Sequence, residues 1–339
     1  MKNLVLIVTV LLTAAAAEAQ WIKQSVNTSA SFRGLSVVSE KIAWASGTGG
    51  TVVRTTDGGK TWSVINVPGA EKLDFRDIEA FDAYTAYILS IGNGDSSRIY
   101  KTIDGGKTWQ LQFTNKNQKA FFDAIACWDS KSCIAMSDPV DSFYYLIETS
   151  DGGATWKHID TEKMDNAKPA EAAFAASGTC LIAHGKNTAF LVTGGSDARV
   201  FRSDDRGWTW SVADTPIVKG TSGSGIFSIA MFDRIRGVIV GGNYEKPGES
   251  GSNLAFTADG GKTWKPGTGL RGYRSGVAFL DKNTIVAVGT SGADVSTDGG
   301  KAWREFGGEN LNAVAAKARK AVWAVGPKGT ILKLDNQKL

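Results

Sequence analysis

Arginine recurs at the same place in three similar short segments of the chain. The segments are residues 32–35 (FRGL), 75–78 (FRDI) and 273–276 (YRSG). If each begins the innermost strand of a repeated sheet, the arginines gather at one rim of a central channel. Guanidinium groups bind carboxylates through paired hydrogen bonds and stack on aromatic faces, so this rim could hold an acidic peptide, a chain terminus or an anionic sugar. The arginines of this predicted patch are Arg33, Arg76, Arg271 and Arg274.

Carboxylates in the same segments could support a different chemistry. Asp77 and Asp123 occupy equivalent positions in adjacent repeats, and Glu79 lies close to the first of them. Two carboxyl groups at a suitable separation across a channel mouth can act as acid and base in glycoside hydrolysis. A simpler interpretation also stays open, in which the arginines are scattered surface charges paired with neighbours such as Asp77.

Other function classes find little support in the composition. The only histidines are His158 and His184, and neither belongs to a set with metal-ligand spacing or to a Ser-His-Asp arrangement. We therefore expect no metal ion and no cofactor. The 38 Lys and Arg residues against 34 Asp and Glu leave a net charge of only +4, and there is no dense basic run. This balance argues against a nucleic-acid partner.

A repeated phrase predicts the elements that position these side chains. Ser/Thr-x-Asp-x-Gly-x-Thr-Trp occurs six times, with Ala302 in place of Thr in the last copy, and successive copies lie 39 to 54 residues apart. Such a period accommodates four short strands and their turns, as in a propeller blade. Its aspartate can accept hydrogen bonds from nearby backbone N–H groups, so we interpret the phrase as a structural turn. The six aspartates are Asp57, Asp104, Asp151, Asp205, Asp259 and Asp298.

The two ends of the repeat region resemble halves of one further blade. Residues 329–334 repeat the pattern of residues 50–55, and residues 20–26 repeat the pattern of the strand that follows the first turn phrase. The N-terminal strand should therefore pair with the C-terminal strands, which gives an all-β fold with seven blades and a single domain over residues 20–339. Residues 178–184 and 244–250 are expected to be inserts in two of the blades.

The N-terminus and the cysteines indicate export. Residues 1–19 contain Lys2, an apolar run and an Ala-Glu-Ala sequence, which is the layout of a cleavable signal peptide. We expect a protein of the periplasm or the extracellular space that does not span a membrane and is a monomer. Of its three cysteines, Cys127 and Cys133 could form a disulfide across a hairpin, with Cys180 buried; three unpaired thiols are the alternative.

The turn phrase is the Asp box, which is shared by sialidases, some endoglucanases and other propellers. Together with the segments 174–179 (FAASGT) and 240–244 (VGGNY), it makes residues 21–334 resemble the photosystem II stability and assembly factor family. The resemblance implies a non-enzymatic assembly scaffold that binds a protein partner, such as a membrane-protein segment or an acidic peptide, through an arginine-rich patch. Arg33, Arg76, Arg271 and Arg274 could supply that patch here.

A glycoside hydrolase of the sialidase or endoglucanase kind is the alternative function, with Asp77, Asp123 and Glu79 as candidate catalytic residues. Sialidase-like chemistry would require a Phe-Arg-Ile-Pro segment, and residues 32–35 lack the proline. The endoglucanases that resemble this chain carry two propellers, whereas this chain has one. The sequence therefore favours binding over catalysis.

Overall fold

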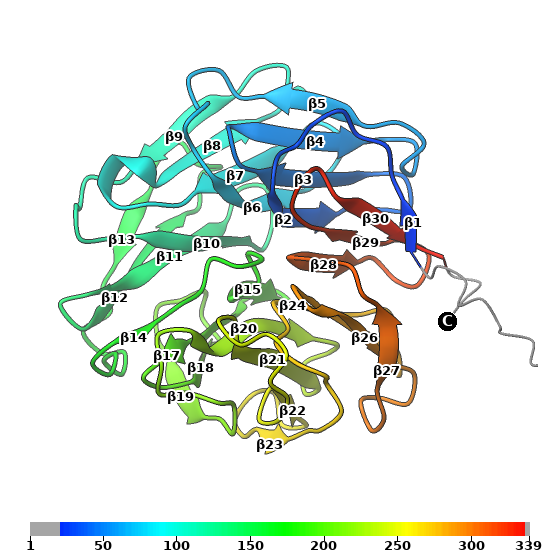
Figure 1. Ribbon diagram of the computed structural model, residues 1–339. Helices are drawn as coiled ribbons and strands as arrows, with labels where there is room; N and C mark the ends of the chain where they lie inside the picture. Colours follow the sequence, from blue (N-terminus) through cyan, green and yellow to red (C-terminus); the bar gives the residue numbers. More distant parts are fainter. Residues whose placement is uncertain (1–20, 336–339) are drawn as a thin grey trace, which may run out of the picture.

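The computed structural model describes residues 21–335. Their strands form seven antiparallel sheets arranged around a central axis (Figure 1). Within these residues the only helix is the short 3-10 helix η1 (Gly94–Ser96). The innermost strands of neighbouring sheets contact one another in a closed ring. The prediction of a seven-bladed all-β propeller is therefore confirmed.

The first three blades each consist of four consecutive strands, which run from the axis to the periphery. Blade 1 contains β2 (Phe32–Val37), β3 (Ala43–Gly47), β4 (Thr51–Thr55) and β5 (Ser63–Asn66). Blade 2 contains β6 (Phe75–Ala80), β7 (Ala86–Ser90), β8 (Arg98–Thr102) and β9 (Gln110–Thr114). Blade 3 contains β10 (Phe122–Cys127), β11 (Cys133–Val140), β12 (Phe143–Thr149) and β13 (Lys157–Ile159).

The remaining blades include short additional strands and the closure of the ring. Blade 4 contains β15 (Leu181–His184), β16 (Thr188–Val192), β18 (Arg199–Ser203) and β19 (Ser211–Asp214). Blade 5 contains β20 (Ser224–Met231), β21 (Gly237–Asn243), β22 (Leu254–Thr257) and β23 (Lys265–Pro266), and it is extended by β17 (Gly194–Gly195) and β14 (Glu171–Ala172). Blade 6 contains β24 (Gly276–Phe279), β25 (Ile285–Gly289), β26 (Gly292–Ser296) and β27 (Arg304–Gly307). Blade 7 contains β28 (Ala313–Ala316), β29 (Val322–Val325), β30 (Ile331–Leu334) and β1 (Trp21–Lys23).

Blade 7 joins the first and the last strand that the structure describes, as the sequence predicts. The N-terminal strand β1 is antiparallel to β30, and Trp21 is paired with Leu334. The Trp21 side chain is buried, and its indole N–H donates a hydrogen bond to the Phe306 carbonyl oxygen of blade 6 over 3.1 Å. This pairing covers the outer edge of β30, which would otherwise be free to pair with another chain.

The Asp boxes connect the third and fourth strands of six blades and are stabilised by their own side chains. In the first copy the Asp57 carboxylate accepts hydrogen bonds from the Thr61 hydroxyl over 2.6 Å and from the Thr61 backbone N–H over 3.0 Å. The Thr55 hydroxyl oxygen accepts the Gly59 N–H over 2.9 Å. The bonds from the Thr61 hydroxyl and the Thr61 N–H, the first most of all, hold the pKa of Asp57 well below its usual range. The Asp-box carboxylates therefore stabilise the turns in which they lie.

The structure corrects one of the two predicted inserts. Residues 178–184 are not an extension, because Leu181–His184 is β15, the innermost strand of blade 4. The long spacing instead comes from the segment that precedes β15. This segment includes β14, which pairs with β17 in the sheet of blade 5. The other predicted insert, residues 244–250, lies in the connection between β21 and β22.

No helix within residues 21–335 is long and apolar enough to cross a membrane.

Candidate binding pocket at the propeller axis

A β-bulge at the start of several innermost strands determines which side chains reach the axis. The pairing register shifts between Phe32 and Gly34, between Phe75 and Asp77, and between Phe122 and Ala124. A bulge leaves one residue unpaired and redirects its side chain. The shift in β20 falls between Ile226 and Ser228. The four bulge residues are Arg33, Arg76, Asp123 and Phe227.

All four bulge residues line one pocket of about 470 Å³. In blade 1, Phe32 precedes Arg33 and pairs with Gly47 at one end of the strands. The Asp box of this blade begins at Thr55, which pairs with Ala43 at the other end. The pocket therefore lies at the end of the axis opposite the Asp boxes. It is further lined by Phe121, Asp138, Ala173, Phe174, Ala175, Ala176, Tyr244, Tyr273, Thr290 and Asn312.

One wall of the pocket is formed by residues 173–176, which are part of the segment 173–178 that we call the axial loop. The Ala176 carbonyl oxygen accepts a hydrogen bond from Arg33 Nη1 over 3.1 Å, and the Ala175 carbonyl oxygen accepts one from Arg76 Nη1 over 3.3 Å. The Phe174 ring stacks on the Phe227 ring with centroids 3.9 Å apart. The axial loop thus fixes the position of both guanidinium groups and builds an aromatic surface beside them.

The two arginines of the pocket differ in their charge partners. Arg76 Nε donates to Asp74 Oδ2 over 2.8 Å, which forms an ion pair. Arg33 has no ion pair within residues 21–335, and its one side-chain hydrogen bond goes to the neutral carbonyl of Ala176. Burial and the nearby Arg76 charge lower the pKa of Arg33 from its usual value. An anion that entered the pocket would compensate this charge.

Blade 3 contributes a pair of carboxyl groups next to the arginines. Asp123 is only 1% exposed, and its Oδ2 atom is buried without a hydrogen-bond partner among the described residues. Burial raises the pKa of Asp123, and the neighbouring Asp138 raises it further. Burial also raises the pKa of Asp138 to about 6, although its carboxylate accepts the Ala173 N–H over 2.9 Å. The pocket therefore has a cationic wall and an acidic wall.

The predicted four-arginine patch is divided in the structure, because Arg274 does not reach the pocket. The backbone N–H of Arg274 donates a hydrogen bond to the Gly241 carbonyl oxygen of the preceding blade. In blade 1 the Phe32 N–H makes the equivalent bond to the Gly326 carbonyl oxygen, so Arg274 takes the position that the buried Phe32 has there. Its guanidinium is 2% exposed and donates to Asp294 Oδ2 over 2.6 and 2.9 Å.

Arg271 also lies outside the pocket lining. Its side chain is half exposed and forms ion pairs with Glu305 over 2.5 Å and with Asp294 over 3.5 Å. Of the four predicted arginines, therefore, only Arg33 and Arg76 line the pocket, whereas Arg271 and Arg274 both form ion pairs with Asp294.

The predicted catalytic carboxyl groups are also separated. Asp77 pairs with Leu89 after the bulge, whereas Asp123 is itself the bulge residue, so the two are not in equivalent positions. Asp77 is buried, and its carboxyl oxygens accept the N–H groups of Ile78 and Ile125 over 2.8 Å each. Burial raises the pKa of Asp77 to about 7. Burial and the Asp77 carboxyl raise the pKa of Glu79.

Asp77 is thus a link between blades 2 and 3 rather than a pocket residue. Of the three predicted catalytic carboxyl groups, Asp123 alone lines the pocket.

Part of the chain matches the model of a known protein family. The family model described as photosynthesis system II assembly factor YCF48 matches residues 13–117. The predicted resemblance to this family is confirmed. No curated protein matches the chain in sequence.

Solved structures share the fold at low sequence identity. A structure described as YCF48 bound to D1 peptide superposes with a TM-score of 0.69 and 17% identity over 94% of this chain and 98% of that one. YCF48 from Cyanidioschyzon merolae gives a TM-score of 0.66 and 17% identity over 94% and 100%. The GH74 enzyme of Niastella koreensis gives 0.63 and 15% over 94% of this chain and 54% of the enzyme. At these identities the likeness establishes the propeller architecture.

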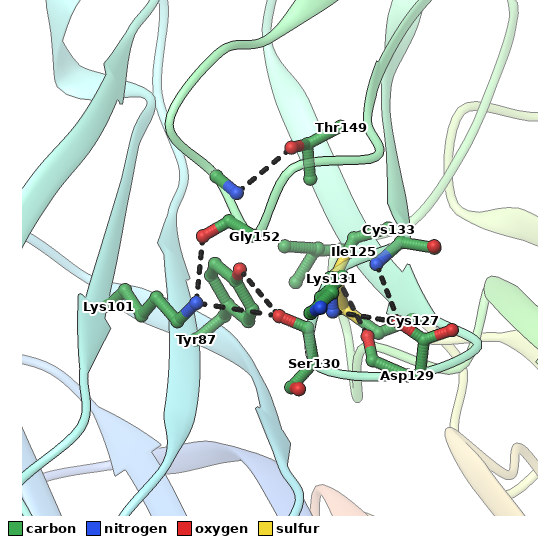
Figure 2. The surroundings of a disulfide bond; sticks show 12 residues. Tyr87, Lys101, Ile125, Cys127, Asp129, Ser130, Lys131, Cys133, Thr149 and Gly152 are labelled. Carbon is green, nitrogen blue, oxygen red and sulfur yellow. Dashed lines mark hydrogen bonds between the residues drawn. A yellow bond between two sulfur atoms is a disulfide. The ribbon is translucent and has the colours of Figure 1, made fainter.

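The chain has a disulfide far from the pocket. Cys127 and Cys133 are paired at the end of the β10–β11 hairpin and joined by a disulfide, with Cα atoms 4.0 Å apart, while Cys180 is free and buried. Figure 2 shows that Ser130, in the loop between them, accepts hydrogen bonds from the Tyr87 hydroxyl and from Lys101 Nζ of blade 2. The disulfide therefore stabilises the β10–β11 loop of blade 3, which forms hydrogen bonds with blade 2 at the Asp-box end.

Sequence reasoning missed several pocket residues. Asp138 and Phe227 are not flagged by any motif, although Phe227 holds the bulge position of blade 5. Phe174 lies in the FAASGT segment, which indicates the family but not a pocket. Tyr244 lies in the predicted insert, which indicates a loop but not a pocket.

Proposed function

We propose that this protein is an exported, non-enzymatic assembly scaffold that binds a protein partner through the axial pocket. In this role Arg33 and Arg76 hold a carboxylate of the partner chain. The observation that carries the proposal is Arg33, a partly buried guanidinium without an ion pair among the described residues, held by the axial loop at a pocket wall. Charge-assisted hydrogen bonds from arginine to a carboxylate are among the strongest polar contacts in proteins.

The dimensions of the pocket agree with a peptide ligand. Its volume of about 470 Å³ suits a short stretch of chain rather than a folded domain. A solved YCF48 structure is described as bound to a D1 peptide, which supports a peptide ligand for this chain as well. The signal-peptide layout of residues 1–19 supports a site of action in the periplasm or outside the cell.

Binding explains the pocket better than hydrolysis. The carboxyl pair expected from the sequence is absent from the pocket, since Asp77 is buried and occupied by two backbone N–H groups. The GH74 enzyme shares the fold of this chain, and only 54% of its length is covered. Fold likeness of this kind does not transfer a catalytic function.

Affinity capture from the exported fraction of the native cell tests the proposal. The bait proteins are the parent, an Arg33→Gln/Arg76→Gln variant, and an Arg271→Gln control that changes an arginine outside the pocket. We expect mass spectrometry to identify a polypeptide that the parent and the control retain and the double variant loses. Equal retention by all three baits would contradict a role for the pocket.

A further inference from the structure

The end of the propeller opposite the axial pocket consists of tight turns. In blade 2 the Gly105 N–H of the Asp box donates to the Tyr84 carbonyl oxygen over 2.9 Å, and in blade 5 the Gly260 N–H donates to the Ile235 carbonyl oxygen over 2.9 Å. This bond joins the Asp box to the turn between the first two strands in six blades, and its acceptors are the carbonyl oxygens of Lys41, Tyr84, Lys131, Asn187, Ile235 and Asn283. The six turns and the six Asp boxes therefore lie at a similar height along the axis. We call the surface that they form the Asp-box face.

The four most exposed large hydrophobic side chains within residues 21–335 all lie on the Asp-box face, and they are between 54% and 70% exposed. Tyr84 and Ile235 are turn residues that accept the bond from an Asp box, and Ile103 and Trp208 belong to the Asp boxes of blades 2 and 4. Trp208 occupies the box position that is lysine in four other blades. Apolar side chains that gather on one surface among polar residues mark a contact with a protein or a membrane.

Exposed lysines occupy repeated positions on the same face. They are Lys60, Lys107, Lys262 and Lys301 in the Asp boxes, and Lys41 and Lys131 in the turns. Acidic residues of the turns are bound to the backbone, since the Asp82 carboxylate accepts the Tyr84 N–H over 2.6 Å and the Asp233 carboxylate accepts the Ile235 N–H over 3.0 Å. The Asp-box carboxylates are held in the same way. Lysine carries its charge on a flexible four-carbon stem, so the cations of this face reach farther toward a partner than the anions do.

The positions of the apolar side chains favour a planar partner. Those of blade 2 lie on a different arc of the ring from those of blades 4 and 5, and blade 3 separates the two arcs. The longer connections, to which the axial loop and Tyr244 belong, line the pocket at the other end and leave the Asp-box face level. A lipid bilayer presents a plane that meets both arcs at once. Trp and Tyr are enriched at membrane interfaces, and anionic headgroups attract lysine.

We infer that the Asp-box face docks on an anionic lipid bilayer, with the four apolar side chains in the headgroup region and the six lysines at lipid phosphates. The inference goes beyond the proposed function and uses the opposite end of the molecule. In this orientation the axial pocket faces away from the bilayer, where a partner chain has access to it.

Vesicle co-sedimentation tests the inference on residues 20–339, which contain every strand that the structure describes. The vesicles consist of phosphatidylcholine alone or of equal parts of phosphatidylcholine and phosphatidylglycerol. The apolar variant is Ile103→Ser/Trp208→Ser. Its control, Ile22→Ser/Phe143→Ser, changes two exposed side chains of β1 and β12 that lie outside the Asp-box face. Thermal unfolding confirms that each variant is folded.

A second pair of variants tests the lysines. The charge variant is Lys60→Gln/Lys262→Gln, and its control, Lys119→Gln/Lys246→Gln, removes two exposed lysines from connections at the pocket end. We expect the parent to bind the anionic vesicles at least about tenfold more tightly than the neutral ones. The apolar variant and the charge variant should each bind the anionic vesicles about tenfold more weakly than the parent. Both controls should stay within about twofold of the parent, as is usual for surface changes.

Equal losses in a variant and its control would overturn the inference, as would a parent that stays in the supernatant with both kinds of vesicle. If the parent ignores vesicles and the apolar variant loses a polypeptide that the parent captures, the Asp-box face binds a protein and the bilayer inference fails.

Arg33→Gln/Arg76→Gln separates the inference from the proposed function. This variant should bind vesicles as the parent does, because its changes lie at the other end of the axis. If it loses vesicle binding, the arginine end contacts the lipid and the inference fails. If it keeps both vesicle binding and every captured polypeptide, the proposed function fails and the bilayer inference stands.

Discussion

The buried ion pair between Glu171 and Arg199 should be the contact whose loss most disturbs the axial loop. The Glu171 side chain is fully buried and that of Arg199 is 5% exposed. Arg199 donates to the Glu171 carboxylate from Nε over 2.9 Å and from Nη2 over 2.6 Å. The same carboxylate accepts the Thr193 hydroxyl over 2.6 Å and the Lys168 N–H over 2.8 Å. It therefore ties β14, which precedes the axial loop, to blade 4.

The magnitude follows from this geometry. Glu171→Ala leaves a buried guanidinium without its counter-charge, and breaking a buried pair by removing one partner costs about 3–5 kcal/mol. We expect the free energy of unfolding to fall by that amount in Glu171→Ala. The double variant Glu171→Leu/Arg199→Met should be more stable than Glu171→Ala, since it removes both charges and fills the space with apolar atoms.

Urea unfolding, followed by tryptophan fluorescence, measures these differences. Hydrogen exchange of residues 171–178 in the same variants reports whether the loss is local to the axial loop and β14. A Glu171→Ala protein within about 1 kcal/mol of the parent would refute the reasoning. So would a double variant that is less stable than the single one.

Three further predictions concern stability. Gly178→Ala should lower the free energy of unfolding by about 2 kcal/mol, because Gly178 has a φ of +78° and a Cβ atom would overlap with the Asp77 carboxyl group; Gly185→Ala, at a φ of +62° with no atom within 4 Å, is the control for backbone strain in thermal unfolding. The pKa of Asp77 is raised to about 7, so the folded state holds the proton of this carboxyl more tightly than the unfolded state does. The contribution of Asp77 to stability is therefore present below pH 4 and is lost as the pH rises through 7. The pH dependence of the melting temperature in the parent and in Asp77→Asn checks this, and the same pH profile in both proteins would contradict it. Replacing Cys127 and Cys133 by Ser should cost about 2 kcal/mol, as expected for the short loop that the disulfide closes, measured by urea unfolding without reductant.

The repeat made most of the fold predictable. The Asp box marks the turn between the third and fourth strands of a blade, and its side chains form the same hydrogen bonds in each full copy, so six blades could be located from the sequence. The composite blade was predictable too, because Trp21 begins a strand that matches the strand following the Asp boxes. Local hydrogen bonding and strand pattern determine both features.

The site was less predictable, because it depends on register rather than on local pattern. Tyr273-Arg274 looks like Phe32-Arg33, but the two segments differ by one position relative to the preceding blade, because the Arg274 N–H makes the bond that the Phe32 N–H makes. Such a shift moves a side chain from the axis to the space between blades. Asp138 enters the pocket from the second strand of its blade, and no repeat marks it. Contacts between distant segments, such as that of Phe174 with Phe227, leave no trace in either segment alone.

The central claim is that Arg33 holds a carboxylate in the axial pocket. The most direct measurement compares N-acetyl-Ala-Ala-Phe with its C-terminal amide, by calorimetry, on the parent, on Arg33→Gln and on the Arg271→Gln control. The account predicts that the parent and the control bind the acid about tenfold or more tightly than the amide, and that Arg33→Gln loses this preference. A parent that binds acid and amide equally, or an Arg33→Gln variant that keeps the preference, would contradict it.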